Sequence, residues 1–164
     1  MTHAVRTFRW LVSALLLALP ATGLGQVTPP AAAAGRVEAY GIAIRIISAQ
    51  PTAGGIDPAL QRYAADFKAM PYKSFKLLDQ HSKELRKGET VSMQFPGPGR
   101  RFLSVKANGT KGGKLGFSLA IDALNFKTTV RIPDNGTLIV GGPRHEQGVI
   151  LLAITAHRQG GDPA

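Results

Sequence analysis

The chain has 164 residues, a length that fits one domain, and with 44% hydrophobic and 18% charged residues its composition excludes a wholly disordered protein. The absence of cysteine excludes disulfides, thiol catalysis, thiolate metal sites and a lipid attached to an N-terminal cysteine. The formal net charge of +10 favours an acidic partner, such as nucleic acid, anionic lipid headgroups or an acidic polysaccharide, unless it reflects only a generally basic composition.

Residues 1–25 are typical of a secretory signal peptide. Arg6 and Arg9 form its positive start, residues 10–19 form an apolar run, and small residues follow up to an expected cut before Gln26. An apolar run of this length rises only about 15 Å as a helix, roughly half of a bilayer's hydrocarbon core. We therefore expect an exported protein, periplasmic or secreted, with no membrane-spanning segment after cleavage.

The string LPATG at residues 19–23 matches the LPxTG signal that sortases cut. A sorting signal is followed by an apolar run and a basic tail, whereas this one ends an apolar run. We interpret it as the end of the signal peptide, where Pro20 breaks the apolar helix. Residues 26–35 form a Pro/Ala-rich linker, either a spacer or an interaction segment, and residues 159–164 read as a disordered tail.

The first predicted strand and the one predicted helix follow the linker. Residues 37–47 alternate as a half-buried strand does, with Arg45 on the side opposite the isoleucines. Residues 57–69 predict a helix, because Asp57 is a suitable N-cap, Pro58 fits the first helical position and apolar residues then recur at helical spacing.

A succession of strands separated by turn residues fills the rest of the chain. The further predicted strands are residues 72–80, 90–95, 100–107, 114–123, 126–132, 136–142 and 149–156. Asn108-Gly109 and Asn135-Gly136 predict hairpin turns, and glycosylation of these N-x-T sequences is the alternative. The sequence thus predicts one α+β domain over residues 36–158, mainly antiparallel β and sandwich-like, with about eight strands and one helix near residues 57–69.

Catalytic and metal-binding motifs are not found in the sequence. No serine stands in a G-x-S-x-G setting, and His81, His145 and His157 lack a second histidine at metal-binding spacing. Paired carboxylates could converge in the fold for acid–base chemistry, and Asp122, directly after a strongly alternating strand, is the first candidate. We predict no catalytic residue, no metal and no cofactor, and whether the protein is an enzyme stays open.

A basic face is the clearest binding feature. If the strands between residues 101 and 131 are neighbours, their lysines and arginine project from one outward face. Phe102 is the one aromatic residue of the same parity, so nucleic acid, which needs several stacking rings, is not the expected partner. The alternative is that these charged residues form only a solvated face. The predicted binding residues are Lys106, Lys114, Lys127 and Arg131, with Arg144 and His145 in a long hairpin loop around residues 140–148.

Residues 128–142, TTVRIPDNGTLIVGG, resemble a strand–turn–strand segment of the barrel wall in secretin-type outer-membrane proteins. The resemblance implies an envelope setting and carries no functional residue across. We expect an exported, non-enzymatic module that binds or scaffolds an envelope protein or polyanionic polymer, accessory to a secretion or outer-membrane assembly. The alternative is a small carboxylate-dependent hydrolase acting on an envelope polymer.

Overall fold

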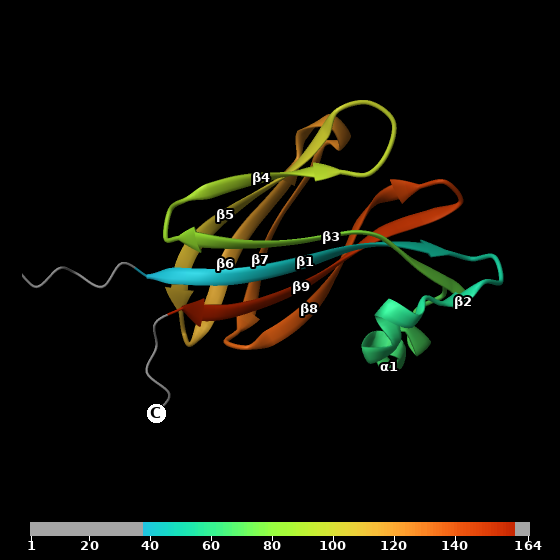
Figure 1. The fold of residues 1–164 in the computed structure, drawn as a ribbon, viewed down its shortest axis with the longest axis horizontal. Helices are drawn as coiled ribbons and strands as arrows, with labels where there is room; N and C mark the ends of the chain where they lie inside the picture. The colour runs from blue at the N-terminus through green and yellow to red at the C-terminus, as the bar shows by residue number, and fades with distance from the viewer. Residues whose placement is uncertain (1–37, 160–164) are drawn as a thin grey trace, which may run out of the picture. The chain divides into compact units, whose positions relative to one another are not determined.

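The computed structural model describes residues 38–159, whose strands form two β-sheets (Figure 1). Sheet A has the strand order β2-β3-β1-β9-β8, and sheet B has the order β4-β5-β6-β7. Every strand pairing is antiparallel except that between β2 and β3. The predicted α+β fold, mainly antiparallel β with one helix near residues 57–69, is therefore confirmed.

Nine strands lie within the described part of the chain, one more than predicted, because β2 is too short to give a sequence pattern. Sheet A contains β1 (Ala39–Gln50), β2 (Gly55–Ile56), β3 (Ser74–Arg86), β8 (Gly136–His145) and β9 (Gly148–Gln159). Sheet B contains β4 (Thr90–Phe95), β5 (Arg101–Lys111), β6 (Lys114–Ile121) and β7 (Phe126–Pro133). The predicted signal peptide and linker lie outside the described residues, as does the predicted tail apart from Gln159.

The main hydrophobic core lies between the two sheets, because the long strands carry apolar residues at alternate positions. On β6 the buried side chains are Leu115, Phe117, Leu119 and Ile121. They face a row of buried residues from β1, in which Tyr40 meets Phe117 edge to face with ring centroids 6.0 Å apart. Burying each of these side chains contributes about 1.5–3 kcal/mol, so the alternation decides which face of sheet B turns inward.

A second, smaller core lies on the other face of sheet A, beneath the helical segment. Leu60, Tyr63 and Phe67 of that segment pack against β1 and β9, and Phe67 stacks on Phe75 of β3 with ring centroids 4.1 Å apart. Sheet A is therefore buried on both faces at this end. This explains why the predicted strand at residues 149–156 is apolar on both sides: it is part of β9, between β1 and β8.

The helix predicted at residues 57–69 is split into a 3₁₀ helix, η1 (Pro58–Tyr63), and a short α-helix, α1 (Ala64–Lys68). The predicted N-cap is confirmed, because the carboxylate of Asp57 accepts a hydrogen bond from the backbone N–H of Ala59 at 2.9 Å. Neither helix is long enough to be stable in water by itself. The segment therefore depends on the second core for its fold.

The Asn108-Gly109 pair does not form a hairpin turn, so this prediction is wrong. The pair lies inside β5, where the register with β6 shifts after Ala107 and Gly109 has a φ of +96°. The chain turns instead at Gly112 and Gly113, whose φ values of +59° and +73° suit a type I′ turn. A bulge and a turn both demand positive φ, so the residue pair by itself does not distinguish them.

The Asn135-Gly136 pair does form a tight turn, but the hairpin prediction is wrong in its strand pairing. β7 pairs with β6 and β8 pairs with β9, so the chain passes here from sheet B to sheet A. The positive φ of Asn135 is a local requirement, whereas the sheet that the next strand joins is decided by burial. Residues 128–142, which resemble the secretin segment, therefore span both sheets.

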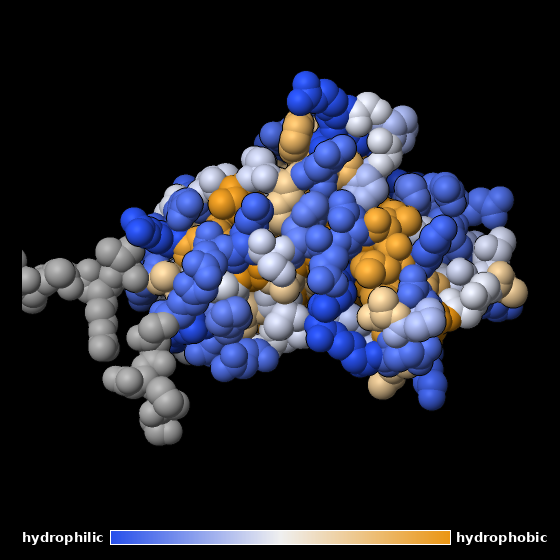
Figure 2. Space-filling model, viewed as in Figure 1, coloured by the Kyte–Doolittle hydropathy of each residue, from blue (hydrophilic) through white to orange (hydrophobic). Residues whose placement is uncertain are grey.

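The outer surface is mostly hydrophilic in the view of Figure 2, with apolar side chains confined to small patches. Among residues 38–159, Phe102 of β5 is the one large hydrophobic side chain that is exposed, at 46%. None of the helices in this range combines the length and apolarity needed to span a membrane.

Candidate anion-binding face of sheet B

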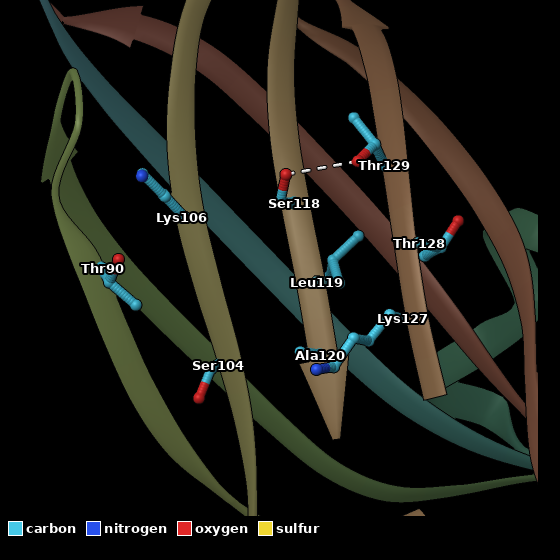
Figure 3. Close-up of a pocket in the computed structure, with 9 residues that line it drawn as sticks. All are labelled: Thr90, Ser104, Lys106, Ser118, Leu119, Ala120, Lys127, Thr128 and Thr129. Carbon is cyan, nitrogen blue, oxygen red and sulfur yellow. Dashed lines mark hydrogen bonds between the residues drawn. The ribbon is translucent and has the colours of Figure 1, made fainter. Parts of the chain in front are cut away.

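Lysine and hydroxyl side chains gather on the outward face of sheet B. They occupy the positions that alternate with the buried core residues, so they project away from sheet A. Lys106 lies opposite Ser118, and Ser118 lies opposite Thr129 on the next strand. In the adjacent row Ala120 lies opposite Lys127. Lys106 and Lys127 therefore stand on β5 and β7, the two strands that flank β6 (Figure 3).

A hollow of about 600 Å³ lies on this face, lined by both lysines. The residues of β5 and β6 that line it include Ser104, Ser118 and Ala120, which are small, so the space between the lysines stays open (Figure 3). The shape follows from the sequence, because Gly116, Ser118 and Ala120, all small, occupy successive outward positions of β6. A linear polymer could lie across this face.

Hydrogen bonds between side chains hold the hydroxyl groups of this face in place. Asn108 Nδ2 donates to Ser118 Oγ at 2.8 Å, and Ser118 Oγ lies 3.2 Å from Thr129 Oγ1 (Figure 3). Ser92 Oγ and Ser104 Oγ are 3.3 Å apart on the neighbouring strands. These hydroxyls can both donate and accept, so they suit a ligand that carries oxygens of both kinds.

The charge of the described residues is concentrated on sheet B. Residues 90–133 contain seven basic residues and one acidic residue, whereas the rest of the described chain contains ten basic and eight acidic residues. The acid in this stretch is Asp122, which begins the short 3₁₀ helix η2 (Asp122–Leu124) between β6 and β7. Its Oδ1 lies 3.5 Å from Lys127 Nζ at an exposed position. Lys106, Lys114 and Arg131 have no carboxylate within 4.0 Å among residues 38–159. The electrostatic potential above this face is therefore positive.

The structure places all four predicted cations of the strands on this one face. Lys114 and Arg131 line a second, smaller hollow of about 150 Å³, which shares Thr129 with the first. Lys111 joins them there, and sequence analysis missed it. The bulge at Asn108 shifts the alternation along β5, and the Asn-Gly pair was the one signal that could have revealed it.

Arg144 and His145 do not join this face, because they belong to β8 of sheet A. The long loop predicted around them is also wrong: β8 continues to His145 and β9 begins at Gly148, which leaves a two-residue turn. Glu146 in this turn has a φ of 51°, and its carboxylate lies 3.9 Å from His145 Nε2. His145 thus has an acidic neighbour, and neither Arg144 nor His145 lines a hollow of sheet B.

Asp122 does not supply the pair of carboxylates that the hydrolase alternative needs. Its side chain is 79% exposed, and the charged group beside it is Lys127 rather than a second acid. His81 bonds the backbone oxygen of Gln94 at 3.0 Å and lies 3.2 Å from Asp79, on the open edge between β3 and β4. Within the described range no three histidine or acidic side chains converge in a way that could hold a metal ion.

No protein-family model matches the sequence, and comparison with curated proteins and with solved structures gave no significant match either.

Proposed function

We propose that the protein is an exported, non-enzymatic β-rich module that binds an acidic polymer of the cell envelope on the outward face of sheet B. The observation that carries this proposal is the charge imbalance of residues 90–133, which contain seven basic residues and one acidic residue. Five of the basic residues line the two hollows of the outward face: Lys106, Lys111, Lys114, Lys127 and Arg131. Export is inferred from the signal-like residues 1–25, and the envelope setting also draws on the secretin-like segment.

Recognition on this face combines charge with hydrogen bonding. Lys106 and Lys127 attract anionic groups over a long range, and the ordered hydroxyls of Ser118 and Thr129 offer short-range contacts between them. The lysines are flexible and exposed, so the face binds a class of polymer rather than one sequence of sugars. Affinity should fall steeply as salt is added, because exposed charges are screened beyond about 10 Å at 0.1 M ionic strength.

The test is the binding of heparin, used as a probe acidic polysaccharide, to the double variant Lys106→Gln/Lys127→Gln. One charge pair at 4 Å in water is worth about 1 kcal/mol. Loss of two lysines should therefore cost about 2 kcal/mol, or roughly thirtyfold in Kd. The matched control is Lys76→Gln/Lys83→Gln on β3 of sheet A, which removes the same charge and should change Kd little.

Equal weakening in the two double variants would show that only net charge matters, and the proposal would fail. Charge reversal of Lys106, Lys114, Lys127 and Arg131 together should abolish retention on heparin at physiological salt. Unchanged retention of that quadruple variant would also overturn it.

A further inference from the structure

Two guanidinium groups meet at one tyrosine hydroxyl on the outward face of sheet A. Arg45 Nη1, from β1, donates to Tyr63 Oη at 3.1 Å, and Arg62 Nη2 donates to the same oxygen. The guanidinium carbon of Arg62 also lies 4.8 Å from the centroid of the Tyr63 ring. Two like charges are thus held together around a single neutral acceptor.

The packing keeps this arrangement in place. Tyr63 is 4% exposed and belongs to the second core, with its ring 6.0 Å from that of Phe67. Arg45 is half-buried in the middle of β1, a strand paired on both sides. Tyr63 and Arg45 are therefore positioned before any ligand arrives, which lowers the entropy cost of binding. Arg62 is exposed and is held beside them by its contacts with the Tyr63 ring and hydroxyl.

Within the described range no carboxylate oxygen lies within 4.0 Å of a guanidinium nitrogen of Arg45 or Arg62. The ion pairs of residues 38–159 include neither Arg45 nor Arg62. Because Tyr63 Oη accepts from both guanidiniums, its own hydrogen is left to donate, and each guanidinium keeps further N–H groups. A half-buried guanidinium without a counterion is unfavourable, and an oxyanion is the ligand that matches such a set of donors.

A hollow of about 670 Å³ opens beside these groups, between the helical segment and the β8 side of sheet A. Arg62 and Tyr63 line it, together with the hydroxyl pair of Thr137 and Thr155, whose oxygens are 2.8 Å apart. Asp66 also lines the hollow and forms no ion pair with either arginine. Its negative charge opposes an anion, so it limits the affinity of the site.

We propose that this hollow is a binding site for a single oxyanion group, a carboxylate or a phosphate, held by Arg62 and the hydroxyl of Tyr63, which Arg45 positions from beneath the lining. The site is separate from the basic face of sheet B, because it lies on the outward face of the other sheet. It contacts one charged group through converging donors, rather than a run of charges along a polymer. A carboxylate or a phosphate can accept two parallel N–H donors from a guanidinium, which a lysine cannot supply.

The test is an NMR titration of the isotope-labelled full chain with inorganic phosphate and, separately, with acetate, at constant ionic strength. We expect saturable shifts at residues 62–66 and 135–137, in the millimolar range, with at least one of the two anions. The anion that binds more tightly identifies the oxyanion. Absence of saturable shifts with both anions would overturn the proposal.

Variants make the test specific to the arginine pair. Arg62→Gln should weaken binding about tenfold or more, since a hydrogen bond to a charged group is lost. Tyr63→Phe keeps the buried ring and should weaken binding by a smaller factor, whereas Asp66→Asn should strengthen it. The matched control is Arg86→Gln at the opposite end of β3, which should bind as the wild type does. Equal loss in the Arg62→Gln and Arg86→Gln variants would contradict the proposal.

Discussion

Replacement of Phe67 by alanine should release the helical segment and leave the sandwich folded. Phe67 is 1% exposed and stacks on Phe75, and removal of a buried phenylalanine side chain costs about 3–5 kcal/mol. The segment at residues 58–68 has no stability of its own to offset this loss. The main core between the sheets contains no residue of this segment, so it should survive the change.

Native-state hydrogen exchange measures directly whether the helical segment is released while the main core stays folded. The backbone N–H groups of Leu60 and Met70, bonded to Asp57 and Phe67 respectively, report on the segment, and those of β6 report on the main core. In the Phe67→Ala variant the segment amides should exchange near the rate of an unfolded chain, whereas the β6 amides should keep most of their protection.

The contrasting variant is Phe117→Ala, in the main core. It should lower the protection of the β6 amides against hydrogen exchange and leave the local opening of the helical segment unchanged. If the segment amides of Phe67→Ala stay as protected as those of β6, the two cores form one cooperative unit and the reasoning is refuted. Oxyanion binding beside Tyr63 should disappear in Phe67→Ala, because the segment that carries Tyr63 is released.

Two further predictions concern single positions. Tyr40 Oη donates to the carboxylate of Glu38 at 2.6 Å, which lowers the pKa of Glu38 from its ordinary value of 4.5. This hydrogen bond stabilises the fold above pH 4.5, and the stabilisation is lost as the pH falls through the lowered pKa. Tyr40→Phe should therefore raise the pKa of Glu38, as followed by NMR of its carboxyl group, and an unchanged pKa would contradict this cause. A Cβ at Gly148 would clash with the backbone oxygen of Ala49, so Gly148→Ala should lower the free energy of unfolding by about 2 kcal/mol or more in urea titrations. Gly141→Ala, with open space around the new methyl group, is the control and should change it little.

The alternation of apolar residues was a sufficient guide to most of the strands. It gave the inward row of β6 and the outward positions of Lys106, Lys127 and Arg131, because side chains of a strand point to opposite faces at every second residue. The cap at Asp57 was equally readable, since it depends on residues that are close in sequence. These features have a local cause, so the sequence pattern was enough to predict them.

Features with a non-local cause were not predicted. Two Asn-Gly pairs that are identical in sequence have different roles, a bulge within β5 with positive φ at Gly109 and a link between sheets with positive φ at Asn135. The arginine pair was also missed, because Arg45 and Arg62 come from different elements and Tyr63 reads in the sequence as one more apolar residue of a helix. Only the folding of the helical segment onto β1 brings these groups together.

The two proposed sites lie on opposite faces of a stack of two sheets. Packed sheets are about 10 Å apart, and the Debye length at physiological ionic strength is about 8 Å, so anions held on the two sides repel each other only weakly. A single molecule can thus be bivalent without the two ligands competing. In a network of acidic polymers such a protein would cross-link two neighbouring polymer chains rather than bind along a single chain.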